Sequence, residues 1–152
     1  MHQININAEK KNTKYIMKIL IIDDNKDKAD VIADFLIGKF GSGTIVNTTG
    51  SINSGKTELD EGGYDVAIID NSLPDDENGS INTIGVPAEI LVSHIQRNYL
   101  DTKAIIMSDE NDKDDQFLQA AKVSYSVCKG VVRFKSDDWK NELVKYITTD
   151  DE

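Results

Sequence analysis

The chain has 152 residues, of which 39% are hydrophobic and 29% charged, and its formal net charge at pH 7 is −10. This composition is typical of one globular domain whose negative charge would repel a nucleic-acid backbone, and no apolar run approaches the ~20 residues of a membrane-spanning helix. The single cysteine, Cys128, has no internal disulfide partner, which fits the reducing cytoplasm expected for this protein.

Short apolar runs alternate with amphipathic helical patterns between a polar arm at residues 1–16, expected to be flexible, and an acidic tail at 150–152. Strands are expected at residues 18–22, 44–49, 66–69, 104–107 and 131–134. Helices are expected at residues 27–40, at 54–61, from Pro87 onward, at 112–123 and at 137–149. This alternation predicts an α/β domain over residues 17–149, a doubly wound five-stranded parallel sheet with helices on both faces.

Polar side chains that suit phosphoryl chemistry follow four of these strands. The first strand stops on Asp23 and Asp24, the third on Asp70, the fourth on Ser108 and the fifth on Lys135. Because ligands bind beyond the carboxyl ends of parallel strands, these five side chains are expected to converge. Two carboxylates about 4 Å apart repel by roughly 4 kcal/mol at an effective dielectric constant near 20. A divalent cation removes that cost, and oxygen ligands favour Mg²⁺.

These residues, in this order at strand ends, resemble the receiver domain of two-component response regulators. The segment Asp70–Pro74, followed by Gly79, is similar to the loop that follows the phospho-acceptor in that family. The resemblance covers roughly residues 17 to 148 and implies the flavodoxin-like fold of receivers.

The resemblance also implies a role for each residue. Asp70 would accept a phosphoryl group from a phosphohistidine, and Ser108 and Lys135 would contact its oxygens. The residues expected to hold Mg²⁺ are Asp24, Asp70, the backbone carbonyl of Ser72 and, through water, Asp23.

The protein is therefore expected to be a stand-alone, phospho-accepting signalling domain, with no enzymatic activity beyond its own phosphorylation and dephosphorylation. Its expected partners are a sensor histidine kinase or phosphotransfer protein and a downstream protein target, and a homodimer is left open. Neither nucleic acid nor membrane is an expected partner.

Several positions depart from the family pattern. Ser108 comes 38 residues after Asp70, a long spacing whose surplus falls at 75–85, where a loop would border the site. Asp109 stands where the family prefers a small residue. Val132 occupies the place of the aromatic switch residue, for which Phe134 is the candidate substitute, and Ser136 replaces a common proline. Asp109, Val132 and the long loop favour an alternative, a receiver-like docking module that works without phosphorylation.

A third interpretation comes from residues 50–57, which match the phosphate-binding pattern G-x-x-x-x-G-K-[ST] with Lys56 as its lysine. Only residues 58–61 separate this motif from Gly62 and the next strand. A phosphate-binding loop must lead into a helix whose N-terminus holds the phosphates. So short a helix makes a nucleotide-binding protein the least favoured reading.

Removing residues 1–16 should leave the fold and its thermal stability almost unchanged, because this polar arm has little to bury. Thermal unfolding of the full and shortened chains, followed by circular dichroism, measures the difference. A fall of many degrees would show that the arm packs against the domain.

Overall fold

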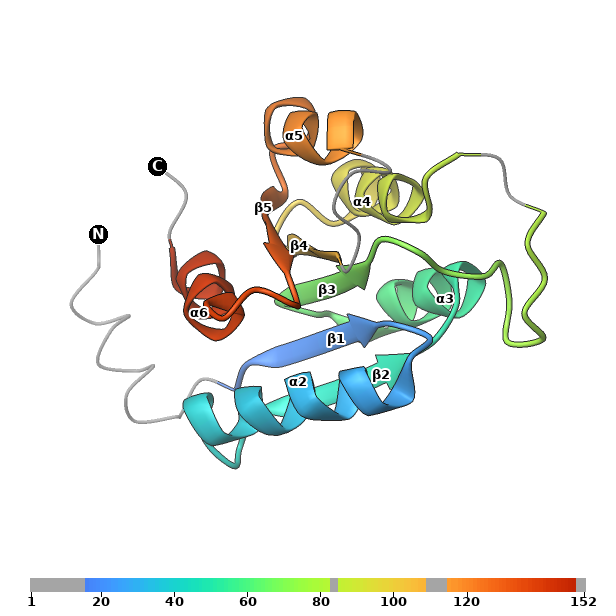
Figure 1. The fold of residues 1–152 in the computed structure, drawn as a ribbon. Coiled ribbons are helices and arrows are strands. Elements are labelled where there is room, and N and C mark those ends of the chain that lie inside the picture. Colours follow the sequence, from blue (N-terminus) through green and yellow to red (C-terminus); the bar gives the residue numbers. More distant parts are fainter. Residues whose placement is uncertain (1–15, 83–84, 109–114, 150–152) are drawn as a thin grey trace.

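Figure 1 shows the fold in a computed structural model, which describes residues 16–82, 85–108 and 115–149. The sheet is parallel, with strand order β2-β1-β3-β4-β5. The strands are β1 (Lys18–Ile22), β2 (Ile45–Thr49), β3 (Val66–Asp70), β4 (Lys103–Ser108) and β5 (Cys128–Arg133). The helices are α2 (Lys26–Phe40), α3 (Ile52–Gly62), α4 (Pro87–Asn98), α5 (Asp115–Ser124) and α6 (Trp139–Thr148). The predicted doubly wound α/β fold is confirmed, whereas most of the predicted arm and the acidic tail lie outside the described residues.

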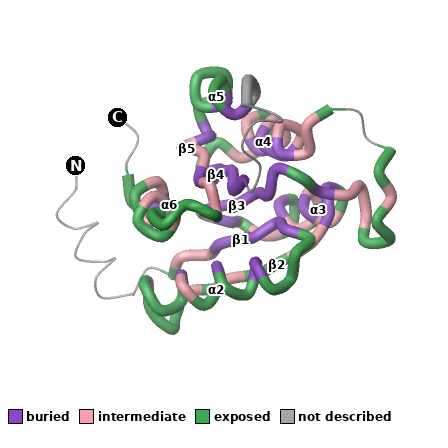
Figure 2. The backbone as a smooth tube through the Cα atoms, in the orientation of Figure 1, coloured by how far each residue is buried: buried purple, intermediate pink, exposed green. Residues whose placement is uncertain are grey.

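Helices cover both faces of the sheet, and the buried residues gather around its central strands (Figure 2). On one face, Leu20 and Ile22 of β1 share a core with α3, α4 and α5. On the other face, Ile19 and Ile21 share a second core with α2 and α6. Strands covered on both sides must be apolar throughout, which explains the continuous hydrophobic runs of β1 and β3. No helix in the described ranges is both long and apolar enough to cross a membrane.

The strand order brings the ends of β1 and β3 together. These strands are adjacent and parallel, with Ile22 paired to Ile69, so Asp23 and Asp70 are the next residues in register. The chain leaves β1 toward the β2 edge and leaves β3 toward the opposite edge. Such a reversal of strand order opens a crevice beyond the carboxyl ends, where doubly wound proteins bind their ligands.

Helix α3 is longer than the sequence analysis predicted, because it begins at Ile52, inside the motif that resembles a phosphate-binding loop. Ser51 caps it through a reciprocal pair of hydrogen bonds with Ser54. The amides of Ile52 and Asn53 donate to the carbonyls of Pro74 and Asp75, over 3.0 and 2.9 Å. The first-turn N–H groups that would bind a phosphate therefore already have partners within the protein.

Gly55, the second glycine of the motif, serves the packing of α3 on β1. A Cβ added there would lie 3.0 Å from Cδ1 of Ile22 and 3.3 Å from the side chain of Leu91. Glycine is thus needed for a close approach of helix and sheet. That structural role accounts for the second glycine of the motif without a nucleotide.

Strand β5 differs from the predicted strand at both ends. It starts at Cys128, three residues earlier than predicted, and Phe134 and Lys135 lie in the turn that follows. Cys128, a free cysteine, is buried. The strand is at the edge of the sheet and its residues alternate between buried and half-buried. The segment Cys128–Gly130 therefore lacks the continuous apolar run by which the inner strands were recognised.

ATP should not bind this protein, and Lys56→Ala should change no property of the folded chain. The reason is that loop carbonyls already occupy the N-terminus of α3. Isothermal titration of ATP, with Mg²⁺ present, into wild-type and Lys56→Ala proteins measures this. Micromolar binding that vanishes in the variant would restore the nucleotide-binding alternative.

Candidate functional site

Three of the predicted ligands meet at the crevice between β1 and β3. Carboxylate oxygens of Asp23, Asp24 and Asp70 all lie within 4.8 Å of one another. Asp23 and Asp70 are buried, whereas Asp24 is exposed. Asp70 is the last residue of β3, and the two other aspartates directly follow β1. The end of a rigid buried strand fixes each backbone position, so the carboxylates are held together despite their mutual repulsion.

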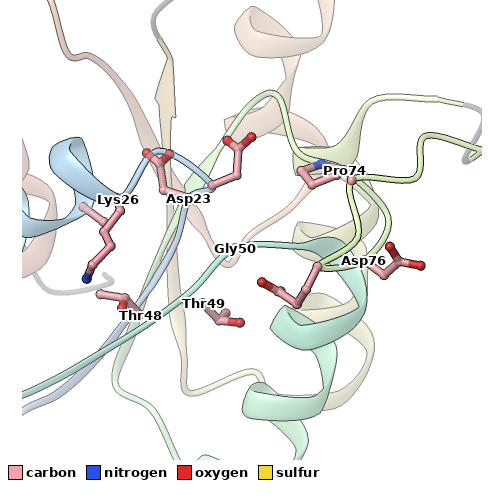
Figure 3. A pocket seen from close by; sticks show the side chains of 11 residues that line it. Asp23, Lys26, Thr48, Thr49, Gly50, Pro74 and Asp76 are labelled. Atoms are coloured by element: carbon pink, nitrogen blue, oxygen red, sulfur yellow. The ribbon is translucent and has the colours of Figure 1, made fainter.

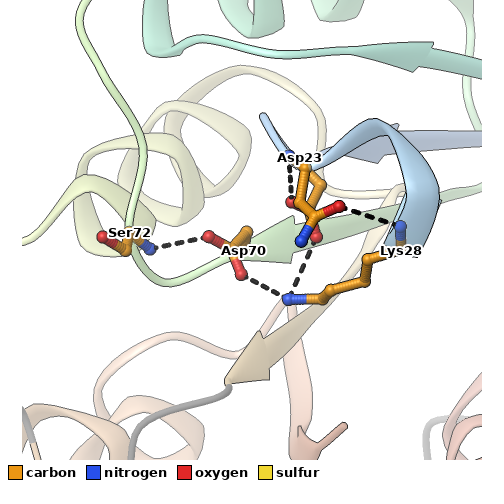
Figure 4. A network of polar contacts seen from close by, with 5 residues as sticks. Asp23, Lys28, Asp70 and Ser72 are labelled. Atoms are coloured by element: carbon orange, nitrogen blue, oxygen red, sulfur yellow. Dashed lines mark hydrogen bonds and ion pairs between the residues drawn. The ribbon is translucent and has the colours of Figure 1, made fainter.

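A fourth side chain, Lys28 of α2, reaches into the same crevice (Figure 4). Its Nζ lies 2.7 Å from Oδ1 of Asp70 and 3.1 Å from Oδ2 of Asp23. The Lys28 side chain is only 4% exposed. Among the residues that the structure describes, the cation in direct contact with Asp70 is therefore Lys28, a residue that the sequence analysis did not single out.

The start of α2 positions this lysine. Oδ1 of Asp23 accepts the amide of Asn25 at 2.9 Å, and the Asn25 side chain in turn accepts the amide of Lys28 at 3.1 Å. Asn25 thereby caps the helix. The helix then continues with Ile32 and Leu36, both buried. Lys28 stands four and eight residues before them, so the helical repeat places it on the buried face, and this spacing was the signal in the sequence that could have revealed it.

Burial and charge together set the ionisation of the crevice. Burial, assisted by the negative charge of Asp23, raises the pKa of Asp70 to about 6, although Lys28 opposes the shift. Burial likewise raises the pKa of Asp23 above its ordinary value. Burial alone would lower the pKa of Lys28, but Asp70 and then Asp23 outweigh it and raise the pKa. Near pH 7 the ammonium is charged and Asp70 is mostly ionised.

The structure also describes three other predicted site residues, Ser72, Ser108 and Lys135. Ser108 ends β4 and is fully buried, and its carbonyl accepts the amide of Phe134 at 3.0 Å. The amide of Ser72 donates to Oδ2 of Asp70 at 3.1 Å. Lys135 is exposed in the turn after β5, and within the described ranges it forms no ion pair with the three aspartates. Asp109 lies outside the described residues. The roles of Lys135 and Ser108 stay predictions.

A cavity of about 350 Å³ opens beside Asp23 and Asp24 (Figure 3). The loop that follows β3 lines it with Pro74, Asp76, Glu77 and Gly79, and Gly50, which follows β2, also lines it. This loop is the surplus segment of the sequence. It therefore borders the carboxylates, as predicted for residues 75–85, of which 83 and 84 lie outside the described residues.

The loop is anchored to the start of α3. Besides the two backbone hydrogen bonds from α3, the hydroxyl of Ser54 donates to Oε2 of Glu77 over 2.7 Å. Hydrogen bonds from Ser54 and then Ser51 lower the pKa of Glu77 below its ordinary value. Glu77 thus adds an ionised carboxylate to the cavity, whose lining holds four acidic residues and one lysine, Lys26.

The donor set fits a hard divalent cation. All the candidate ligands are oxygens, which suits Mg²⁺ and not a metal that prefers nitrogen or sulfur. Moreover, Oδ2 of Asp23 is buried and makes no hydrogen bond within the described part of the chain, although it faces Lys28. A buried carboxylate oxygen needs a cation to neutralise it, and in this structure the Lys28 ammonium, 3.1 Å away, supplies that charge. Asp23, Asp24 and Asp70 would hold Mg²⁺.

Comparison with solved structures shows the same fold in response regulator receiver domains. RcsB from Salmonella enterica serovar Typhimurium, bound to promoter rprA with the phosphomimetic BeF3⁻, has a TM-score of 0.66 at 17% identity, over 88% of this chain and 66% of that one. The isolated REC domain of RcsB has a TM-score of 0.65 at 17% identity, over 86% and 87%. A CheY-like receiver from Methanospirillum hungatei JF-1 has 0.65 at 15% identity, over 88% and 91%.

These comparisons identify the chain as having the receiver-domain fold. The chain spans less than two thirds of the length of two of the RcsB chains that it matches. It covers 66% of the chain bound to promoter rprA and 57% of a second RcsB chain. No protein-family model and no curated protein matches the sequence.

The stability of wild type relative to Asp70→Asn should fall as pH rises from about 4 to about 6. The raised pKa means that the folded protein binds this proton more tightly than the unfolded chain, so the free energy of unfolding declines as the proton is lost. A shift of two pH units corresponds to a change on the order of 2–3 kcal/mol. Urea unfolding at a series of pH values measures the difference between the two proteins.

Asp34→Asn is the matched control, because Asp34 is exposed on α2 and the change in charge is the same. The difference between wild type and Asp34→Asn should stay flat over this range. A flat difference for Asp70→Asn as well would contradict the raised pKa of Asp70.

Proposed function

We propose that this protein is a receiver that accepts a phosphoryl group on Asp70 in a Mg²⁺-dependent reaction and signals by binding another protein. The observation that supports this most strongly is the placement of Asp70. On a receiver fold, it is a buried carboxylate at the end of β3, beside Asp23 and Asp24 and in contact with an ammonium group. Its raised pKa still leaves the nucleophilic carboxylate as the main form near neutral pH.

The proposed transfer requires a carboxylate oxygen of Asp70 to attack the phosphorus of a phosphohistidine. A P–O bond to Asp70 forms as the P–N bond to the imidazole breaks, and the imidazole takes up a proton. Mg²⁺, when bound, would neutralise the transferring oxygens. The amide of Ser72 holds one Asp70 oxygen, over 3.1 Å, and so orients the carboxylate. Lys135 and Ser108 are the groups proposed to bind the phosphoryl oxygens of the product.

The output would be a change in protein binding, since the product adds negative charge at the junction of β3 and its long loop. The proposed phosphodonor is a sensor histidine kinase or a phosphotransfer protein in the cytoplasm. Two of the similar structures are complexes with DNA, and in both the DNA-bound protein is RcsB. For this chain, with a net charge of −10, a protein target is the better proposal.

A second candidate, the docking module that works without phosphorylation, is supported by one observation. Lys28 already lies 2.7 Å from Asp70 in this structure, so a group of the chain itself offsets part of the negative charge in the crevice. In that case the same surfaces would bind a partner constitutively.

Incubation with acetyl phosphate and Mg²⁺ should add one phosphoryl group to the wild-type protein and none to Asp70→Asn, because the variant lacks the nucleophile. Intact-mass spectrometry measures the phosphorylated fraction directly. Omission of Mg²⁺, or addition of a chelator, should reduce it strongly.

Asp76→Asn is the matched control, since Asp76 is another carboxylate of the same cavity and should remain dispensable for labelling. A wild-type protein that resists small phosphodonors and phosphorylated partners, while still binding a protein target, would favour the docking module. Labelling that persists in Asp70→Asn would mean that another residue is the acceptor.

A further inference from the structure

We infer that Lys28 is the resident cation of the carboxylate crevice, and that a divalent ion binds tightly only when Lys28 is displaced. This inference rests on the proposed function in one respect, namely that the three aspartates form a divalent-cation site. It adds a regulatory element: the affinity of that site is set by a lysine within the same chain.

Without the two carboxylates, the position of Lys28 in α2 would be unfavourable for a charged lysine. It is the third residue of the helix, at the end where the helix dipole disfavours positive charge. It is also among the buried residues of α2, and a lysine is almost never fully buried unless it is paired. The two short contacts, 2.7 Å to Asp70 and 3.1 Å to Asp23, supply that pairing.

The same oxygens would be needed by a metal ion. Oδ1 of Asp70 and Oδ2 of Asp23 face the ammonium, and these two aspartates belong to the three whose oxygens lie within 4.8 Å. Mg²⁺ requires oxygens at about 2.1 Å in octahedral geometry. An ammonium group 3.1 and 2.7 Å from oxygens of these two carboxylates lies against the oxygens that a metal ion would need, and it repels the incoming ion. The two cations therefore compete for one set of ligands.

An aromatic contact makes the displacement of Lys28 observable. Its Nζ lies 5.4 Å from the ring centroid of Phe134, close enough for a cation–π interaction. The Phe134 ring is 5.0 Å from that of Trp139, which also contacts Phe35 of α2 at 5.4 Å. Trp139 is the single tryptophan of the chain. Movement of Lys28 away from the crevice should therefore change the fluorescence of Trp139.

Mg²⁺ binding to wild type, Lys28→Met, Lys28→Arg and Lys26→Met, measured by calorimetry, tests the competition. Lys28→Met should bind Mg²⁺ at least about tenfold more tightly than wild type, because an adjacent positive charge has been removed. Lys28→Arg keeps the charge and should bind as weakly as wild type. Lys26→Met is the control, because it removes the same charge from a side chain that lines the same cavity but is 85% exposed. The affinity of this variant for Mg²⁺ should change much less.

Two further readouts keep the result decisive if Lys28→Met is unstable. Its midpoint of thermal unfolding should rise more with added Mg²⁺ than that of wild type, since a ligand stabilises the state that binds it. The change of Trp139 fluorescence that Mg²⁺ causes in wild type should be lost in Lys28→Met. Equal or weaker Mg²⁺ binding by Lys28→Met, or an equal gain in Lys26→Met, would overturn the inference.

The proposed function is judged separately, by phosphorylation of the wild-type protein. Wild type that is labelled at Asp70, with Lys28→Met binding Mg²⁺ no better, would refute the competition and leave the receiver function standing. Tighter Mg²⁺ binding by Lys28→Met with no labelling of either protein would support the competition and refute the phospho-acceptor function.

Discussion

The arrangement of the site depends on one buried contact, that of the Lys28 ammonium with the carboxylates of Asp23 and Asp70. Three carboxylates within 4.8 Å would repel one another by several kcal/mol if they were all ionised. One buried positive charge offsets part of that repulsion without any bound ion. The ion pairs also tie α2 to the ends of β1 and β3, so the geometry of the helix and that of the crevice are coupled. Any cation or phosphoryl group that enters the crevice must alter this contact.

The topology of the sheet explains why the charges meet at this point. β1 and β3 are neighbours although α2, β2 and α3 lie between them in the chain. The residues that follow the two strands are therefore forced together at a reversal of strand order. The loop after β3 then closes one side of the crevice by hydrogen-bonding to the start of α3 through Pro74, Asp75 and Glu77. This contact also explains why a motif that resembles a phosphate-binding loop has no free amide groups to offer.

Much of the fold could be predicted from sequence, because strands buried on both faces must be apolar and helices between them must be amphipathic. The edge strand β5 and the start of α3 were harder to predict. Cys128–Gly130 was missed because an edge strand has no need of a continuous apolar run, and α3 was placed too late because its cap at Ser51 depends partly on a distant loop. Asp23, Asp24 and Asp70 were identifiable because each follows a strand. Lys28 was overlooked although its spacing from Ile32 and Leu36 places it on the buried face of α2, since a lysine near a helix start is usually solvated and its partner Asp70 lies 42 residues away.

The central claim is that Asp70, neutralised by Lys28 in this structure, is a phospho-acceptor whose activation displaces the lysine. A crystal structure of the protein with Mg²⁺ and the phosphomimetic BeF3⁻ tests this most directly. The account predicts BeF3⁻ on the Asp70 carboxylate, Mg²⁺ among the three aspartates, and Lys28 Nζ no longer bridging Asp23 and Asp70. An unmodified Asp70 that keeps its contact with Lys28 at saturating Mg²⁺ and BeF3⁻ would contradict it.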